Sequence, residues 1–263
     1  MKPIYKPSGR ALEYSPDALA CNLYTGCPHR CFYCYSPSVL RKDKEAFHTD
    51  VAPRAGIITA LKKQLLSGTV SYYETVINGP VETNERRTIA LSGKLIHLCF
   101  TCDPYPAGYD TSVTREAIKA IKEAGCHVQI LTKGGTEAER DFDLLDGDDW
   151  FGVTITGGYV ESEPGAAPEA DRVANLRKAK GRGISTWVSF EPVINPYAVY
   201  LSIAERGEYI DLFRIGKLNY HQSDIDWATF GQECERLCKV YNRKYYIKAD
   251  LRAEMEKERG SLQ

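Results

Sequence analysis

The stretch that most constrains this chain runs from Asn22 to Ser36 and places Cys27, Cys31 and Cys34 in one short loop, with the spacing Cys-x3-Cys-x2-Cys. Thiolates bind iron well, and cube-shaped iron–sulfur clusters normally take four of them. A loop that supplies three leaves one iron open, as a catalytic metal requires. No second cysteine pair follows close behind this loop, as a zinc finger would need, because the next Cys-x2-Cys pair, Cys99 and Cys102, stands far along the chain. The spacing therefore favours a three-cysteine [4Fe–4S] cluster, with a zinc site or three inert cysteines spaced by chance as the alternatives.

Length and composition limit the class of protein. The 263 residues, 43% of them hydrophobic, suit one large domain with a substantial core. A formal net charge of −1 provides no global basic field for nucleic acid, although it leaves room for a local basic groove. No apolar run is long enough to span a bilayer, and the first residues lack the apolar core of a signal peptide. Nine cysteines favour an intracellular, reducing compartment, and we expect a cytoplasmic protein.

Strands and helices alternate along the chain. Apolar runs predict strands at residues 18–25, 94–103, 127–132, 150–156, 184–191, 210–216 and, shorter, 245–247. Helical spacing predicts helices at residues 53–66, 111–125, 136–145, 168–182, 195–206 and 223–241, followed by a charged C-terminal helix. We expect residues 70–77 to form a short strand or hairpin, and residues 82–87 a solvated loop or helix.

This alternation predicts an α/β fold. Repeated β–α units of about 30 residues imply a parallel sheet with right-handed crossovers. Six units predict a partial (β/α)6 TIM barrel rather than the closed eight-unit form. We expect residues 1–17 to be an N-terminal surface segment, residues 18–222 the partial barrel, and residues 223–263 a helical extension packed on it.

Polar groups follow the predicted strands, at the end where barrels of this type collect their chemistry. Every one of the six main strands ends in a hydroxyl, charged or thiol group, and the six ends would converge on one mouth. The first strand ends in the cysteine loop, and the others contribute Thr101, Cys102, Asp103, Lys133, Thr154, Glu191 and Lys217.

The motifs taken together resemble a known group of enzymes. The combination Asn-Leu-Tyr-x-Gly-Cys-x3-Cys-x-Tyr-Cys-Tyr, Thr-Cys-Asp-Pro-Tyr, Leu-Thr-Lys and Ser-Phe-Glu-Pro is similar to that of the spore photoproduct lyase-related branch of the radical S-adenosylmethionine (radical SAM) superfamily, often described as DNA-repair-photolyase-like. The resemblance covers roughly residues 18–220. It implies a radical SAM barrel whose three cysteines bind a [4Fe–4S] cluster, with S-adenosylmethionine chelated by the open iron. In that chemistry a one-electron reductant of the flavodoxin or ferredoxin type gives an electron to the cluster. The reduced cluster cleaves S-adenosylmethionine to methionine and a 5′-deoxyadenosyl radical, and the radical abstracts a hydrogen atom from the substrate.

The resemblance also implies roles for single residues in cofactor binding. Tyr33 would lie by the adenine of S-adenosylmethionine. Lys133 matches a lysine that contacts the methionine carboxylate, and Thr154 sits where the family places a small hydroxyl residue near the methionyl amine. Thr101 and Asp103 occupy a strand end where polar contacts to S-adenosylmethionine are common. The alternatives are a solvated surface lysine for Lys133 and a β-branched strand residue for Thr154.

Two alternative roles are open for each of three further residues, Glu191, Lys217 and Cys102. Glu191 either faces the mouth, where it would bind a ribose hydroxyl or a substrate group, or forms an ion pair with Lys217. Lys217 would otherwise bind an anionic substrate. Spore photoproduct lyase uses a cysteine in the region of Cys102 to return a hydrogen atom to a substrate radical. We hypothesise the same catalytic role for Cys102, although it does not fall on the matching position, and the alternative is a small buried residue.

The substrate follows from the resemblance rather than from the residues. The branch indicates a lyase-like or modifying enzyme that acts on a nucleic acid or nucleotide, although the near-neutral charge argues mildly against duplex DNA. The alternatives are radical modification of a peptide or small metabolite, and a non-catalytic metal-binding or electron-transfer protein.

Overall fold

The computed structural model describes residues 2–14, 17, 19–78 and 81–261. Within these ranges eight strands form one sheet, in the order β1-β2-β5-β6-β7-β8-β9-β10. Their bounds are β1 Ile4–Tyr5, β2 Leu19–Cys21, β5 Leu95–Leu98, β6 His127–Thr132, β7 Trp150–Thr154, β8 Ser185–Phe190, β9 Leu212–Ile215 and β10 Tyr245–Ile247. β1 pairs antiparallel with β2, and the other neighbouring strands pair in parallel. The expected α/β class with a mostly parallel sheet is confirmed.

The sheet is open at both edges. Within the described ranges β1 and β10 form its edges and do not pair with each other, so no closed barrel is seen. The parallel strands follow one another across the sheet in chain order, as β–α units with crossovers of one hand produce. Their carboxyl ends, and the loops that follow, therefore lie along one edge of the sheet.

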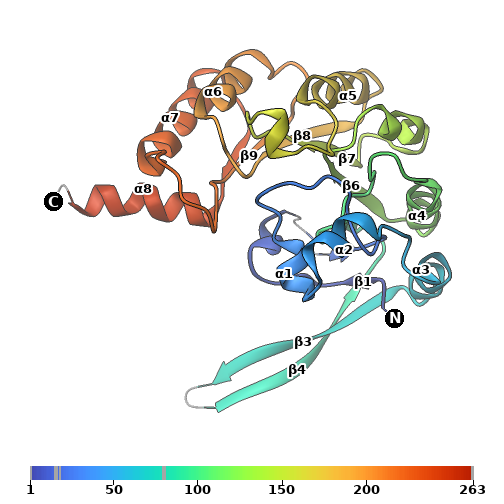
Figure 1. The fold of residues 1–263 in the computed structure, drawn as a ribbon. Helices are drawn as coiled ribbons and strands as arrows, with labels where there is room; N and C mark the ends of the chain where they lie inside the picture. The colour runs from blue at the N-terminus through green and yellow to red at the C-terminus, as the bar shows by residue number, and fades with distance from the viewer. Residues whose placement is uncertain (1, 15–16, 18, 79–80, 262–263) are drawn as a thin grey trace.

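Helices cover the outer side of this sheet along an arc (Figure 1). The connecting helices are α3 Ile57–Leu66, α4 Ser112–Glu123, the 3-10 helix η2 Thr136–Leu144, α5 Glu169–Gly181, α6 Pro196–Glu205 and α7 Trp227–Val240. In α4, Ala117, Ile118 and Ile121 share one face and are buried, which explains why this amphipathic segment packs on the sheet. The helix expected at 136–145 is a 3-10 helix, in which the short side chains of Asp141 and Asp143 reach Arg115 of α4.

The N-terminal segment is partly buried and partly exposed. Ile4 in β1 is fully buried. The 3-10 helix η1 (Gly9–Tyr14) ends in Tyr14, whose ring lies 6.0 Å from Trp187 and 5.8 Å from Phe100, in edge contacts. These contacts anchor the segment to the body, while most of its described residues remain partly or fully exposed, and its bounds as a surface segment stay a prediction.

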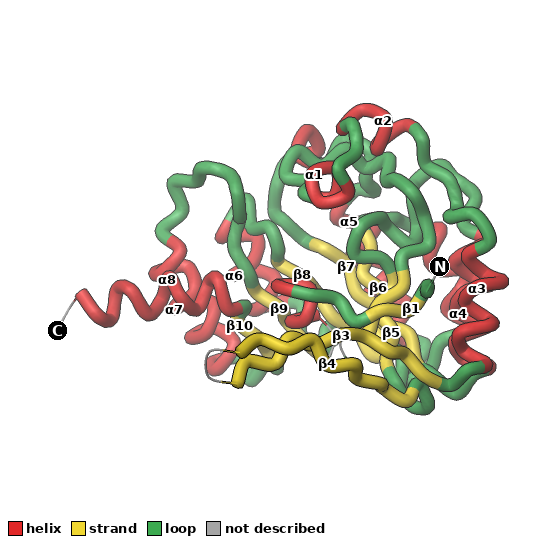
Figure 2. Tube along the Cα trace, turned by 90° about the horizontal axis from the view of Figure 1, so that it is seen from below, coloured by secondary structure: helices red, strands yellow, loops and turns green. Residues whose placement is uncertain are grey.

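A long two-stranded ribbon projects from the body (Figures 1 and 2). β3 (Thr69–Asn78) and β4 (Val81–Ala90) pair antiparallel along their whole length. The hairpin alternative for residues 70–77 is therefore confirmed, whereas a loop or helix at 82–87 was wrong. The polar residues of β4 become a strand because β3, rich in β-branched and aromatic residues, supplies a pairing partner.

The C-terminal part contributes to the sheet as well as to the helical layer. β10 pairs in parallel with β9, so it extends the sheet. The final helix α8 (Ala249–Ser261) packs on α7, where Gly231 lies against Met255 and Leu251. None of the helices in the described ranges has the length and apolar character that a membrane span needs.

Candidate functional site

The three-cysteine loop (residues 27–34) follows β2 and is held by backbone hydrogen bonds from two sides. The Cys27 N–H donates to the carbonyl of Phe47 at 3.1 Å, in the short helix α2 (Lys44–Thr49). On the other side the Phe32 N–H donates to the carbonyl of Ser162 at 3.1 Å. These bonds fix the loop backbone, and hence the origins of its side chains, against two segments far apart in sequence.

The three thiols of the loop are close enough to influence one another's pKa. Burial raises the pKa of Cys27 well above its usual value, and the nearby Asp103, Cys31 and Cys34 raise it further. Burial likewise raises the pKa of Cys31 to about 11, while the cation of Lys133 opposes the rise. A positive partner is needed here, because thiolate ligands concentrate negative charge.

Another group of side chains has its metal-ligating atoms close together. Within the described ranges, the set of three with all ligand atoms within 4.8 Å of one another is His127, Asp146 and Asp148, which is distinct from the cysteines. Whether the three thiols hold a cluster or a single zinc ion stays a prediction.

Lys133 follows β6 and lies beside the loop. Its Nζ is 5.5 Å from the centre of the Tyr33 ring. Burial lowers the pKa of Lys133, but Cys31 and Glu163 raise it by more, so the net shift is upward and the side chain stays charged. The solvated-lysine alternative does not describe this position, since Lys133 is only partly exposed and faces the cysteine loop.

A buried ion pair supports the loop from behind. Glu163 and Arg172 are 6% and 2% exposed, and Glu163 Oε2 lies 2.7 Å from Arg172 Nη2. The Tyr33 hydroxyl donates to Glu163. Arg172 also donates through Nη1 to the Thr154 carbonyl at 3.0 Å. The sequence analysis did not single out Glu163 or Arg172, because one lies in an irregular loop and the other on a helix with no distinguishing motif.

Asp103 joins the ends of two strands to the cysteine loop. Its Oδ1 accepts from the Thr132 hydroxyl at 2.5 Å and the Tyr105 N–H at 2.8 Å. Its Oδ2 accepts from the Lys133 N–H at 2.8 Å and lies 3.5 Å from His29 Nδ1. The Asp103 carboxylate therefore contacts four protein groups, and these contacts hold the ends of the two strands against His29 of the cysteine loop. A direct contact to a cofactor stays a prediction.

The two threonines expected at the site both lie at strand ends. The Thr101 hydroxyl oxygen is buried and has no hydrogen-bond partner among the described residues. Thr154, the last residue of β7, is 2% exposed and is tied through its carbonyl to Arg172. A buried hydroxyl without a partner costs free energy unless a ligand or water satisfies it, so Thr101 fits a ligand-facing position.

Glu191 does not pair with Lys217. The Glu191 carboxylate accepts from Lys248 and from the Tyr14 hydroxyl, while Lys217 pairs with Glu254 on α8. The ion-pair alternative was therefore wrong about the partner. Glu191, which follows β8, and Lys248, which follows β10, are both largely buried. Tyr14 from the N-terminal segment contacts this pair through its hydroxyl.

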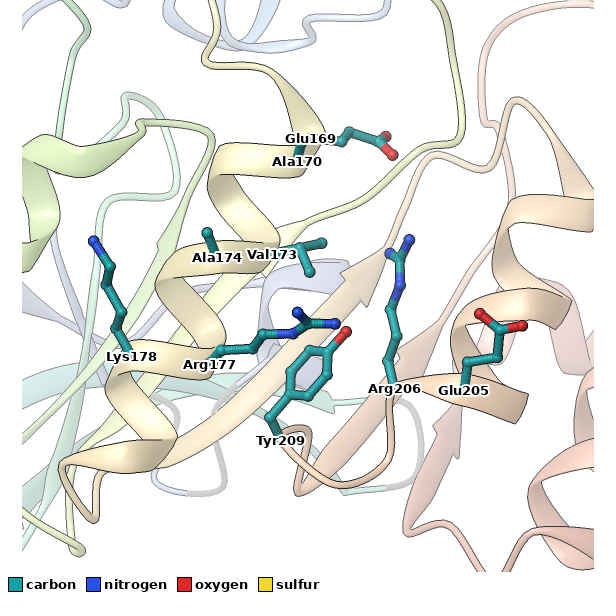
Figure 3. Close-up of a pocket in the computed structure, with 9 residues that line it drawn as sticks. All are labelled: Glu169, Ala170, Val173, Ala174, Arg177, Lys178, Glu205, Arg206 and Tyr209. Atoms are coloured by element: carbon teal, nitrogen blue, oxygen red, sulfur yellow. The ribbon is translucent and has the colours of Figure 1, made fainter.

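A separate hollow lies away from the strand ends. Figure 3 shows it in the outer helical layer, between α5 and α6, where Arg177 stacks over Tyr209 at 4.7 Å. The residues that line it are Glu169, Ala170, Val173, Ala174, Arg177, Lys178, Glu205, Arg206 and Tyr209. None of the predicted site residues is among them, so the chemistry is not placed there.

Comparison with known proteins adds the fold and one sequence relative. No protein-family model matches the chain. The uncharacterized protein ORF301 of Acidianus two-tailed virus is 29% identical over 224 residues, which span 79% of this chain and 69% of the relative.

Solved structures of spore photoproduct lyase share the fold of this chain. One, in complex with dinucleoside spore photoproduct, has a TM-score of 0.60 and 16% identity. Two point mutants of the same enzyme have TM-scores of 0.62 and 15% identity. All three alignments cover 88% of this chain and 76% of the solved chain. These comparisons show that the chain and spore photoproduct lyase share a fold.

Proposed function

We propose that this protein is a radical SAM enzyme of the spore photoproduct lyase-related type. In this proposal Cys27, Cys31 and Cys34 hold a [4Fe–4S] cluster, and the open sheet serves as a partial (β/α) barrel with S-adenosylmethionine at its mouth. The observation that carries the proposal is the three-thiol loop, in which Cys31 is buried and Cys27 and Cys34 are partly buried, with the Lys133 cation beside it. The fold shared with spore photoproduct lyase supports it.

When bound, the cluster and S-adenosylmethionine supply a one-electron reduction that ends in removal of a hydrogen atom from the substrate. The protein's own residues bind and orient S-adenosylmethionine. Lys133 offers a cation for a carboxylate, in a site where partial burial strengthens the pairing. Thr101 and Thr154 offer hydroxyl groups at neighbouring strand ends, and the Tyr33 backbone offers hydrogen bonds to an adenine. Asp103 holds the two strand ends and the loop in register.

Glu191 and Cys102 have more specific proposed roles. Glu191 would contact a ribose hydroxyl or a substrate group, although Lys248 and Tyr14 hold its carboxylate in the described structure. Cys102 would return a hydrogen atom to a substrate radical. A flavodoxin or ferredoxin would supply the electron.

The proposed substrate is a nucleic acid or nucleotide. It is supported by the solved structure of spore photoproduct lyase, which was determined with a dinucleoside. Binding of single-stranded and duplex oligonucleotides at two salt concentrations tests this part, since phosphate contacts make affinity fall as salt rises. Absence of any salt-dependent binding would favour a peptide or small metabolite.

One experiment tests the enzyme class. The protein is reconstituted anaerobically with iron and sulfide, reduced with dithionite and mixed with S-adenosylmethionine. We expect about four irons per chain and the formation of 5′-deoxyadenosine. Cys31→Ala should lose both, whereas Cys126→Ala, at a buried cysteine outside the loop, should retain both. One bound zinc per chain, or full iron loading without 5′-deoxyadenosine, would contradict the proposal.

A further inference from the structure

Cys99 and Cys102 form a Cys-x-x-Cys pair in the turn that follows β5. Cys99 has a φ of +72°, a left-handed conformation that non-glycine residues seldom adopt. The next two N–H groups, of Phe100 and Thr101, both donate to Asn22 Oδ1, at 2.8 and 3.0 Å. One asparagine side chain therefore pins the turn between the two cysteines, and a strained backbone held in place this way often marks a functional site.

The turn keeps the two thiols near each other on one short stretch of backbone. Cys99 and Cys102 each change the pKa of the other. Both are free thiols in the described structure. Two cysteines three residues apart in one turn have the spacing from which a disulfide forms without a large backbone movement.

The environment makes the two thiols unequal. Burial raises the pKa of Cys102, but the neighbouring Cys99, the backbone of Tyr24 and the cation of Arg54 lower it by more, so the net shift is downward. Burial and the neighbouring Cys102 raise the pKa of Cys99 well above its usual value. Two neighbouring thiols with pKa values shifted in opposite directions suit a dithiol in which one sulfur is the more reactive.

Exposure distinguishes the same two residues. Cys99 is 6% exposed, whereas Cys102 is partly exposed and so within reach of a small reagent. Cys21, at the end of β2, is also near the pair, but it is fully buried and burial raises its pKa to about 12. Cys102 is therefore the attacking group, and Cys99 the group that completes the bond.

We propose that Cys99 and Cys102 are a redox-active dithiol, which exchanges reversibly with a small-molecule disulfide to form an intramolecular disulfide. The Cys102 thiolate attacks one sulfur of the small disulfide and expels one thiolate, which leaves a mixed disulfide. Cys99 then gives up its proton and attacks Cys102 Sγ, expelling the second thiolate. The two protein thiols lose two electrons in total, and the small disulfide gains them as two thiols. The exchange itself needs neither the cluster nor S-adenosylmethionine, although it uses the same Cys102 that the proposed function makes a hydrogen-atom donor.

The sequence provides a direct readout. Cleavage after Lys94 and Arg115 releases one tryptic peptide, residues 95–115, that contains these two cysteines and no other. The cluster-loaded protein is incubated anaerobically with glutathione disulfide, quenched in acid, alkylated and digested without reduction. We expect the peptide to have lost two hydrogens and to resist alkylation, and dithiothreitol to reverse both changes. In the reduced protein, iodoacetamide should modify Cys102 at least about tenfold faster than Cys99.

Variants separate a dithiol from two ordinary buried cysteines. Cys99→Ala should accumulate a Cys102–glutathione mixed disulfide, because the resolving thiol is gone, and Cys99→Ser serves if the alanine variant does not fold. Cys234 and Cys238, both buried on α7, are the control pair and should remain thiols. A folded protein whose 95–115 peptide stays a dithiol under glutathione disulfide, or in which Cys102 pairs with Cys21, would overturn the proposal.

Discussion

The Glu163 carboxylate and the Arg172 guanidinium lie 2.7 Å apart behind the cysteine loop, with both side chains almost completely removed from solvent. Burying two charges is costly, and the pair is tolerated because each charge satisfies the other and both make further hydrogen bonds. This pair connects Tyr33 of the loop to the end of β7, so it transmits the geometry of the sheet to the candidate site.

Removal of the arginine should destabilise the protein strongly. Arg172→Met leaves the Glu163 charge buried without its partner, and we expect the free energy of unfolding to fall by about 3–5 kcal/mol. Denaturant unfolding measures the change. Arg236→Met, which breaks an exposed pair with Glu233 on α7, is the control and should have little effect. Equal losses in the two variants would show that burial of the pair is unimportant.

The same pair predicts a pH dependence of stability. Burial raises the pKa of Glu163, but Lys133 and Arg172 lower it by more, so the folded value lies below the ordinary 4.5. Its stabilising contribution is therefore complete above pH 4.5 and is lost as the pH falls through the folded value. The free energy of unfolding should fall more steeply below this pH in the wild type than in Glu163→Gln, by at most about 1.4 kcal/mol per pH unit. Parallel slopes would contradict this assignment.

Gly165 should be needed for the shape of the cysteine loop. Its N–H donates to the His29 carbonyl at 3.0 Å, and a methyl group at this position would overlap the carbonyl oxygen of Pro28. We expect Gly165→Ala to cost about 1–3 kcal/mol of stability and to lower the iron bound per chain after reconstitution. Gly181→Ala is the matched control, because its added carbon would meet no atom within 4 Å. Full iron loading in Gly165→Ala would refute a constraint on the loop.

Lys133 should contribute to binding of S-adenosylmethionine if the proposed function holds. Lys133→Met removes the cation beside the loop, and we expect at least about tenfold weaker binding, or about 1.4 kcal/mol. Equilibrium dialysis of the cluster-loaded protein measures the affinity, and iron analysis shows whether the cluster remains. Lys178→Met, at an exposed pair with Glu139, is the control. The proposed role is lost if both variants bind S-adenosylmethionine as the wild type does.

Much of the fold was predictable because its signals are local. Helix periodicity placed the buried face of α4, and apolar runs placed the parallel strands within a few residues. The ribbon β3–β4 was predicted only in part, because β4 is polar and becomes a strand through pairing with β3. The packing of Tyr14 against Phe100 and Trp187 was not predictable, since nothing in a short polar segment indicates which surface it will cover.

The sequence by itself determined the order of the β–α units and the spacing of the three cysteines, because both depend on residues that are neighbours in the chain. Only the tertiary structure decided the partners of the charged groups. Glu191 is paired with Lys248, 57 residues away, instead of the expected Lys217. An ion pair depends on the distance between two side chains in space, and that distance exists only after the strand ends have been brought to one edge of the sheet.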